Sequence, residues 1–168
     1  MIGIRLTNPP NDLVLLFSGI EKEFYFSYSE FVLSELSKDN VQSFLNMVIR
    51  KEKVDLSKVA DIRIMRFPFG TSQAEIEYAD RKKIKLEGGT YFGHYIPELK
   101  RIDIYPPRFN NELIKNTSAK QFYDNEEIRC FWFFYQPLKT LVHELLHIKY
   151  KEHEGTVERL SQKYMNLL

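Results

Sequence analysis

The stretch that begins at Pro137 constrains the fold most, because its apolar residues recur with the period of an α-helix. Pro137 suits the first turn of a helix, where a missing N–H costs nothing, and no further glycine or proline occurs before Gly155. Six apolar residues fall on one arc of about 160° of this helix: Leu138, Leu141, Val142, Leu145, Leu146 and Ile148. The pattern predicts a helix that buries one broad side in the core.

Three of the four histidines fall within eleven positions of this stretch, at His143, His147 and His153, and Glu144 follows the first of them. Residues four apart lie on one side of a helix, so His143 and His147 can direct two imidazoles at one point. Glu144 lies about 100° round the helix, beside a metal bound there. The pattern H-E-x-x-H is the signature of zinc hydrolases. It predicts Zn²⁺ on the two histidines and Glu144 as general base; the alternative is two hydrogen-bonded or solvated histidines beside a chance glutamate.

A third metal ligand requires the helix to end. On an unbroken helix His153 would lie about 120° round from His147 and about 9 Å further along the axis. It can bind the same metal only if the chain turns back near residues 151–152. Gly155 and Thr156 fit such a break, followed by a new helix over residues 157–167. Three residues at or after the break are candidates, His153, Glu154 and Glu158, because His₃ and His₂Glu sets both form open catalytic zinc sites.

The sequence from His143 to His153 resembles the H-E-x-x-H-x5-H signature of small cytoplasmic zinc metallopeptidases of the YgjP and WLM type. Those families are similar to the SprT-like proteases and, more distantly, to the minimal gluzincins, whose third ligand is a glutamate. The resemblance implies a zincin-like α+β fold with an antiparallel sheet before the zinc helix, peptide-bond hydrolysis, and His153 as third ligand. Val157 only partly matches the large apolar residue that follows the last histidine in the YgjP type.

Two related families differ in their ligands. Metzincins share the histidine spacing but have a glycine where Tyr150 stands in this chain. Proteases of the ImmA/IrrE type also carry H-E-x-x-H, and their third ligand is a glutamate on a following helix. Glu154 or Glu158 would fill that role, although the family's glutamate usually lies further downstream.

The rest of the chain predicts one domain over residues 1–168, of α+β class, with an antiparallel sheet packed on helices. Expected strands cover residues 2–6, 13–17, 23–28, 59–67, 74–78 and 84–86, with the second and third joined as a hairpin around Gly19. Expected helices begin at Ser27 or Ser29 and run through Leu36, and begin at Asp39 or Asn40 and run through Ile49. Residues 90–97 and 98–107 predict a hairpin that ends at Pro106 and Pro107.

This hairpin precedes the zinc helix and offers an edge strand, to which an extended peptide can add. Tyr91, His94 and Tyr95 would line that edge or donate hydrogen bonds to an oxyanion. The alternative is that they are half-buried sheet aromatics with a surface histidine. Residues 130–135, which are all large or apolar, are expected to pack beside the zinc helix.

Composition restricts the partners. The formal net charge of +1 gives no electrostatic reason to expect nucleic-acid or membrane binding, so the expected partner is a protein or peptide substrate. The single cysteine, Cys130, excludes an internal disulfide and a multi-cysteine zinc site. The N-terminal residues lack the apolar core of a signal peptide, and the apolar run from Leu13 to Phe17 is too short to span a bilayer. We therefore expect a cytoplasmic protein.

Two other functions share the motif. A zinc hydrolase of a non-peptide substrate would use the same residues, but a nucleotide substrate lacks support because the sequence has no Gly-rich phosphate loop. A binding module could hold the metal for structure alone. Glu144 favours catalysis over that alternative, because a structural site needs no base.

Overall fold

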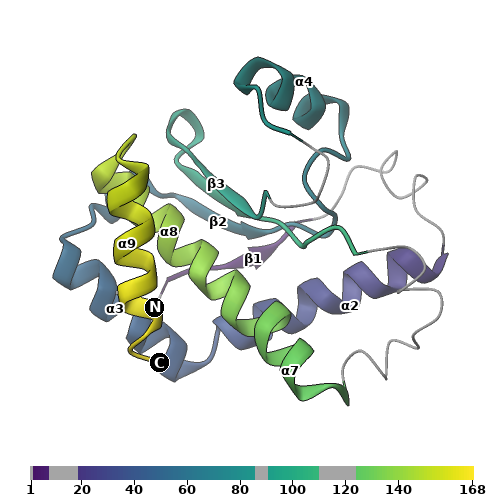
Figure 1. The fold of residues 1–168 in the computed structure, drawn as a ribbon, viewed down its shortest axis with the longest axis horizontal. Coiled ribbons are helices and arrows are strands. Elements are labelled where there is room, and N and C mark those ends of the chain that lie inside the picture. The colour runs from purple at the N-terminus through teal and green to yellow at the C-terminus, as the bar shows by residue number, and fades with distance from the viewer. Residues whose placement is uncertain (1, 8–18, 86–90, 110–123) are drawn as a thin grey trace.

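The computed structural model describes residues 2–7, 19–85, 91–109 and 124–168, and these form a four-stranded mixed sheet with helices on both sides (Figure 1). The sheet order is β1-β2-β4-β3. The strands are β1 (Arg5–Leu6), β2 (Asp61–Ile64), β3 (Gly93–Ile96) and β4 (Arg101–Ile104). The predicted α+β class is therefore confirmed.

The predicted antiparallel sheet was wrong, because β1, β2 and β4 run parallel and only β3 pairs antiparallel, with β4. Parallel neighbours need a long crossover between them, whereas antiparallel neighbours can be joined by a tight turn. The described residues between β1 and β2 include two long helices. Among the described connections, the turn at Pro97–Leu99, a 3₁₀ helix termed η2, is the one short enough to join neighbouring strands directly. The predicted hairpin of residues 90–107 is this β3–β4 pair.

The helices that surround the sheet differ in length and in the side they cover. In Figure 1, α4 lies on one side of the sheet, and α2 and α8 lie on the other. The helical elements are α2 (Gly19–Leu36), α3 (Asp39–Glu52), η1 (Leu56–Lys58), α4 (Gln73–Lys82), α7 (Glu126–Arg129), the π-helical η3 (Cys130–Tyr135), α8 (Gln136–Tyr150) and α9 (Glu154–Met165). No helix among these is long and apolar enough to cross a membrane.

Two predicted strands are helices. Residues 23–28 belong to α2, whose buried residues Phe24, Tyr28, Val32 and Leu36 recur every four positions, which is a helical period. Ser27 and Ser29 therefore lie inside this helix and do not begin it.

Residues 74–78 belong to α4. Ser72 and Glu75 form a reciprocal capping box at its start. This cap favours a helix here, although the side chains alternate as they would in a strand. Ile84 and Lys85 are not in a strand, and residues 13–17 and Leu86 lie outside the described residues.

The other elements follow the sequence more closely. Helix α3 extends past Ile49, with Lys38 at its N-cap position and no side-chain cap. The strand predicted over residues 59–67 is confirmed in its middle as β2, and that over residues 2–6 is reduced to β1. The predicted apolar side and end of the histidine-bearing helix are those of α8, and a new helix follows it. Pro137 lies in the first turn of α8, but the helical backbone already begins before it, in η3.

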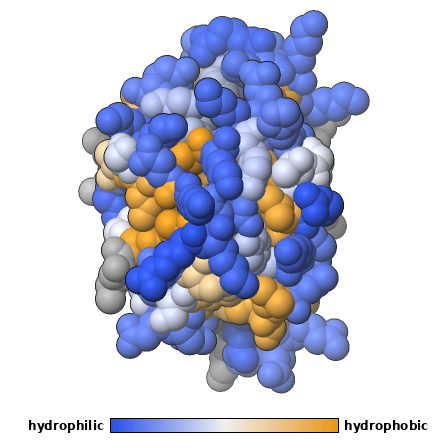
Figure 2. Space-filling model, turned by 90° about the vertical axis from the view of Figure 1, so that its left-hand side faces the viewer, coloured by the Kyte–Doolittle hydropathy of each residue, from blue (hydrophilic) through white to orange (hydrophobic). Residues whose placement is uncertain are grey.

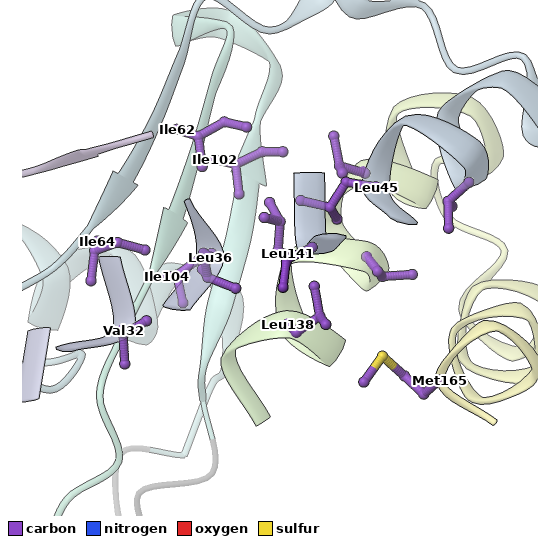
Figure 3. Packing of buried hydrophobic residues seen from close by; sticks show 14 of the residues in the cluster. Val32, Leu36, Leu45, Ile62, Ile64, Ile102, Ile104, Leu138, Leu141 and Met165 are labelled. Atoms are coloured by element: carbon purple, nitrogen blue, oxygen red, sulfur yellow. The ribbon is translucent and has the colours of Figure 1, made fainter. Parts of the chain in front are cut away.

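The main core lies between one side of the sheet and helices α2, α3, α8 and α9. Figure 3 shows the isoleucines of β2 and β4 facing apolar side chains of α2 and α8. The largest fully buried residues include Leu36, Leu45, Ile62, Ile64, Ile102, Leu138, Leu141 and Leu145. Burying one such side chain stabilises the fold by about 2 kcal/mol, so this core holds α8 firmly on the sheet.

A smaller apolar cluster consists of the buried residues Phe69, Ala79 and Tyr105, with Tyr78 and Tyr91 packed against them. Ala79 belongs to α4, so this cluster attaches that helix to the sheet.

The side of the molecule that carries α9 and α3 is largely hydrophilic, with apolar patches between the polar side chains (Figure 2). A cleft lies between β3, α8 and α9.

Candidate metal centre

Helix α8 places the two histidines of the motif side by side. Their ring centroids are 4.7 Å apart, and the two Nε2 atoms are separated by 3.0 Å. Each side chain retains 18% of its exposure, because the opposite side of the helix is packed into the core. The spacing of four residues thus directs His143 and His147 to one point at the cleft.

The end of α8 reverses the chain within three residues. Lys151 adopts φ 44° and ψ −111°, and the His153 N–H donates to the Tyr150 carbonyl at 2.9 Å. These values fit the first central position of a type II′ turn, which favours glycine. The turn lets α9 begin at Glu154 and run back along α8. The break expected at residues 151–152 is therefore present.

Glu154 is the residue that this turn brings to the histidines. Its Oε1 lies 3.1 Å from Nε2 of His143, and its Oε2 lies 3.1 Å from Nε2 of His147. Among the described residues, these three side chains form the group whose ligand atoms all lie within 4.8 Å of one another. His153 is exposed at the N-cap of α9 and outside this group, so the structure assembles the glutamate alternative and not the His₃ set implied by the H-E-x-x-H-x5-H resemblance.

The chemistry of this group fits zinc. Two imidazole nitrogens and a carboxylate form one of the donor sets of catalytic zinc sites. Ligand atoms about 2.1 Å from a tetrahedral ion are about 3.4 Å from one another. Here the two Nε2 atoms are 3.0 Å apart, and each lies 3.1 Å from a different oxygen of Glu154. The Nδ1 of His147 lies within hydrogen-bond reach of the Lys151 carbonyl, which can only accept. Nδ1 therefore carries the hydrogen, and the lone pair of Nε2 faces the group.

Glu158 lies behind the ring of His143. Its Oε2 is 3.5 Å from Nδ1 of His143, and its Oε1 accepts a hydrogen bond from Lys139 Nζ at 2.8 Å. Nδ1 is the nitrogen of His143 that points away from Glu154. Glu158 is therefore placed to orient the imidazole and not to bind a metal held at Nε2. Lys139 lowers the pKa of Glu158 through this hydrogen bond.

Glu144 is buried beside the group, with 7% of its surface exposed. Its Oε2 accepts a hydrogen bond from the backbone N–H of Tyr95 on β3 at 2.8 Å. Burial raises the pKa of Glu144 to about 8; the Tyr95 N–H works against this rise, and the negative charge of Glu154 adds to it. A bound divalent cation would favour the ionised carboxylate.

The cleft has a volume of about 1000 Å³ and lies between the edge strand β3 and helices α8 and α9. Gly93 makes this arrangement possible, since a Cβ there would lie 2.5 Å from Cγ2 of Thr140 and 2.9 Å from the Asp103 carbonyl oxygen. The missing side chain allows β3 to lie directly against α8. His143, His147, Glu154 and Glu144 all line this cleft.

Tyr91, His94 and Tyr95 all line the cleft, but their side chains have different surroundings. The Tyr91 ring packs 4.3 Å from Phe69, and burial raises the pKa of Tyr91. The His94 ring stacks on Tyr78 at 5.4 Å, and burial lowers the pKa of His94 to about 4. These two rings belong with the smaller apolar cluster. Tyr95 contributes its backbone N–H to Glu144, and its hydroxyl donates to the Lys58 carbonyl.

Lys139 and the Lys151 carbonyl were not identified from the sequence. Lys139 lies four residues before His143, which places it on the same side of the helix, so its spacing was a usable signal. The Lys151 carbonyl carried no signal, because a type II′ turn is expected to show glycine at that position. Residues 130–135, expected to pack beside the histidine-bearing helix, instead form a π-helical segment that continues directly into α8. The fully buried Phe133 packs against Tyr28 and Phe31 of α2.

Comparison of the chain with protein-family models, with curated proteins and with solved structures found no match in any of the three. The function is therefore argued from the geometry and chemistry of the site.

Proposed function

We propose that this protein is a zinc-dependent metallopeptidase with a zincin-like fold. His143, His147 and Glu154 would hold the zinc, and Glu144 would act as general base. The observation that supports this most is the meeting of donors from two helices: the two imidazole Nε2 atoms are 3.0 Å apart, and each lies 3.1 Å from one oxygen of Glu154. A buried carboxylate that is not needed as a ligand, that of Glu144, lies next to them. A structural zinc site has no use for such a carboxylate.

Bound zinc would supply a Lewis acid that acidifies water and polarises a carbonyl group. Glu144 would accept the proton of the attacking water and return it to the leaving amine. Its carboxylate is held in place by the Tyr95 N–H, and its burial excludes competing solvent. Glu144 is thus held where it can take up that proton and return it.

A peptide is favoured over other substrates by the position of β3. This strand ends the sheet order of the described residues and forms one wall of the cleft. An extended polypeptide can add to such an edge through its backbone. Glu154 as third ligand favours a site of the minimal-gluzincin or ImmA/IrrE kind, in which the third ligand is also a glutamate, although Glu154 follows the motif more closely than is usual in the ImmA/IrrE type.

The experiment is the metal content of protein purified without chelator, for the wild type and for Glu154→Ala, His153→Ala and Glu158→Ala. We expect one zinc per chain in the wild type, retention in His153→Ala and loss in Glu154→Ala. Loss with His153→Ala alone would instead support the H-E-x-x-H-x5-H family.

A second measurement separates catalysis from metal binding. Glu144→Gln should keep its zinc and lose cleavage of a quenched-fluorescent peptide mixture. Wild-type activity in this variant would remove Glu144 as the base, and absence of zinc from the wild type would refute the proposal.

A further inference from the structure

Lys139 connects the two helices that carry the metal-ligating group. It lies four residues before His143 on α8, and its Nζ donates to Glu158 Oε1 of α9 at 2.8 Å. The other oxygen of Glu158 lies 3.5 Å from Nδ1 of His143. The three side chains therefore form a series: the Lys139 ammonium group holds the Glu158 carboxylate, and this carboxylate faces Nδ1 of the His143 imidazole.

The same contacts distinguish the two carboxylates of α9. Glu154 and Glu158 are four residues apart, so both face α8. Among the ion pairs of the described residues, Glu154 contacts the two histidines, whereas Glu158 also contacts Lys139. Among these ion pairs, Lys139 is thus a positive charge that contacts Glu158 and not Glu154.

We propose that Lys139 is a positioning residue: it holds Glu158 behind the imidazole of His143, which fixes that ring with Nε2 toward the metal and leaves Glu154 as the ligand carboxylate. This inference rests on the proposed zinc site. The partner of one ring nitrogen decides which nitrogen is free to bind a metal. The Glu158 side chain is 52% exposed, so without Lys139 it would sample several rotamers and hold the ring less well.

The test is zinc affinity, measured by competition with a chromogenic chelator. The variants are Lys139→Met, Lys139→Arg, Glu158→Gln and the double variant Lys139→Met/Glu158→Gln. Lys38→Met is the matched control, because it breaks a Lys–Glu ion pair of 2.6 Å with Glu35 that lies outside the cleft. Circular dichroism of the metal-free proteins verifies folding, and Lys139→Ala replaces Lys139→Met if that variant does not fold.

We expect Lys139→Met to bind zinc about 10-fold more weakly, which is the smaller effect usual for residues that orient a metal ligand. Lys139→Arg should keep most of the affinity, because it retains the charge and the donor. The double variant should bind no more weakly than Glu158→Gln alone, since Lys139 acts through Glu158.

Each opposite result overturns the inference. Tighter binding in Lys139→Met would mean that the lysine only repels the cation. Effects of the two single variants that multiply in the double variant would mean that Lys139 acts independently of Glu158. If the wild type and Lys139→Met bind zinc equally well, the role of Lys139 is refuted and the zinc site is not. If the wild type binds no zinc, the proposed function is refuted as well.

Discussion

Replacing Glu144 by glutamine should stabilise the metal-free protein, although it removes the proposed base. Burial raises the pKa of Glu144 from 4.5 to about 8, so the folded protein keeps a proton on this carboxyl that the unfolded chain releases. Between these two values the folded state binds more protons, and its stability falls as the pH rises. Below pH 4.5 both states are protonated, and the penalty vanishes.

The size of the effect follows from the width of this pH interval. One pKa unit corresponds to about 1.4 kcal/mol, so the ionisation of Glu144 lowers the free energy of unfolding by about 3 kcal/mol at pH 7 and by about 4 kcal/mol at pH 8, where half of the folded molecules are ionised. Glutamine does not titrate, and its carbonyl oxygen can still accept the Tyr95 N–H. An unpaired amide N–H₂ would cost about 1 kcal/mol, but that cost is independent of pH. The pH dependence of the difference is therefore the diagnostic quantity.

The assay is urea unfolding in the presence of a chelator at pH 5, 6, 7 and 8, followed by the fluorescence of Trp132, the single tryptophan. The difference between Glu144→Gln and the wild type should grow by about 1.4 kcal/mol per pH unit. Glu152→Gln, the same change at an exposed glutamate of the cleft, is the matched control. Parallel curves for Glu144→Gln and the wild type would refute the argument that Glu144 is buried without a compensating charge.

Two further substitutions test the backbone that shapes the site. Gly93→Ala should destabilise the fold by about 2 kcal/mol, because its Cβ would lie 2.5 Å from Thr140 Cγ2. Urea unfolding measures the loss, and adding Thr140→Ser should recover part of it. An unchanged midpoint in Gly93→Ala would mean that β3 does not lie against α8. Lys151→Gly should stabilise the protein by about 1 kcal/mol by relieving the positive φ, with zinc affinity unchanged because the backbone carbonyl still faces His147. A lower midpoint in Lys151→Gly would contradict the type II′ turn.

Several elements were predictable because their signals are local. Helix α8 and the meeting of His143 and His147 follow from a spacing of four residues, which any α-helix brings to one side. The β3–β4 hairpin was predictable because its turn is short. The strands predicted at residues 23–28 and 74–78 failed because aromatic and alternating residues suit a strand and a helix side alike, and the buried repeat of α2 and the capping box of α4 decided otherwise.

By itself, the sequence determined the α+β class, the histidine pair, the position of Glu144 and the break after α8. Only the tertiary structure decided that the sheet is mixed, because strand direction depends on which strands become neighbours. It also decided the third donor. The turn at Lys151 sets where α9 starts. As a result, the carboxylate of Glu154 lies 3.1 Å from each imidazole, whereas His153, one residue earlier, lies exposed outside the group. Spacing along a helix is a property of the chain, whereas the meeting of two helices depends on the backbone angles of one residue and on the packing of α8 against α9.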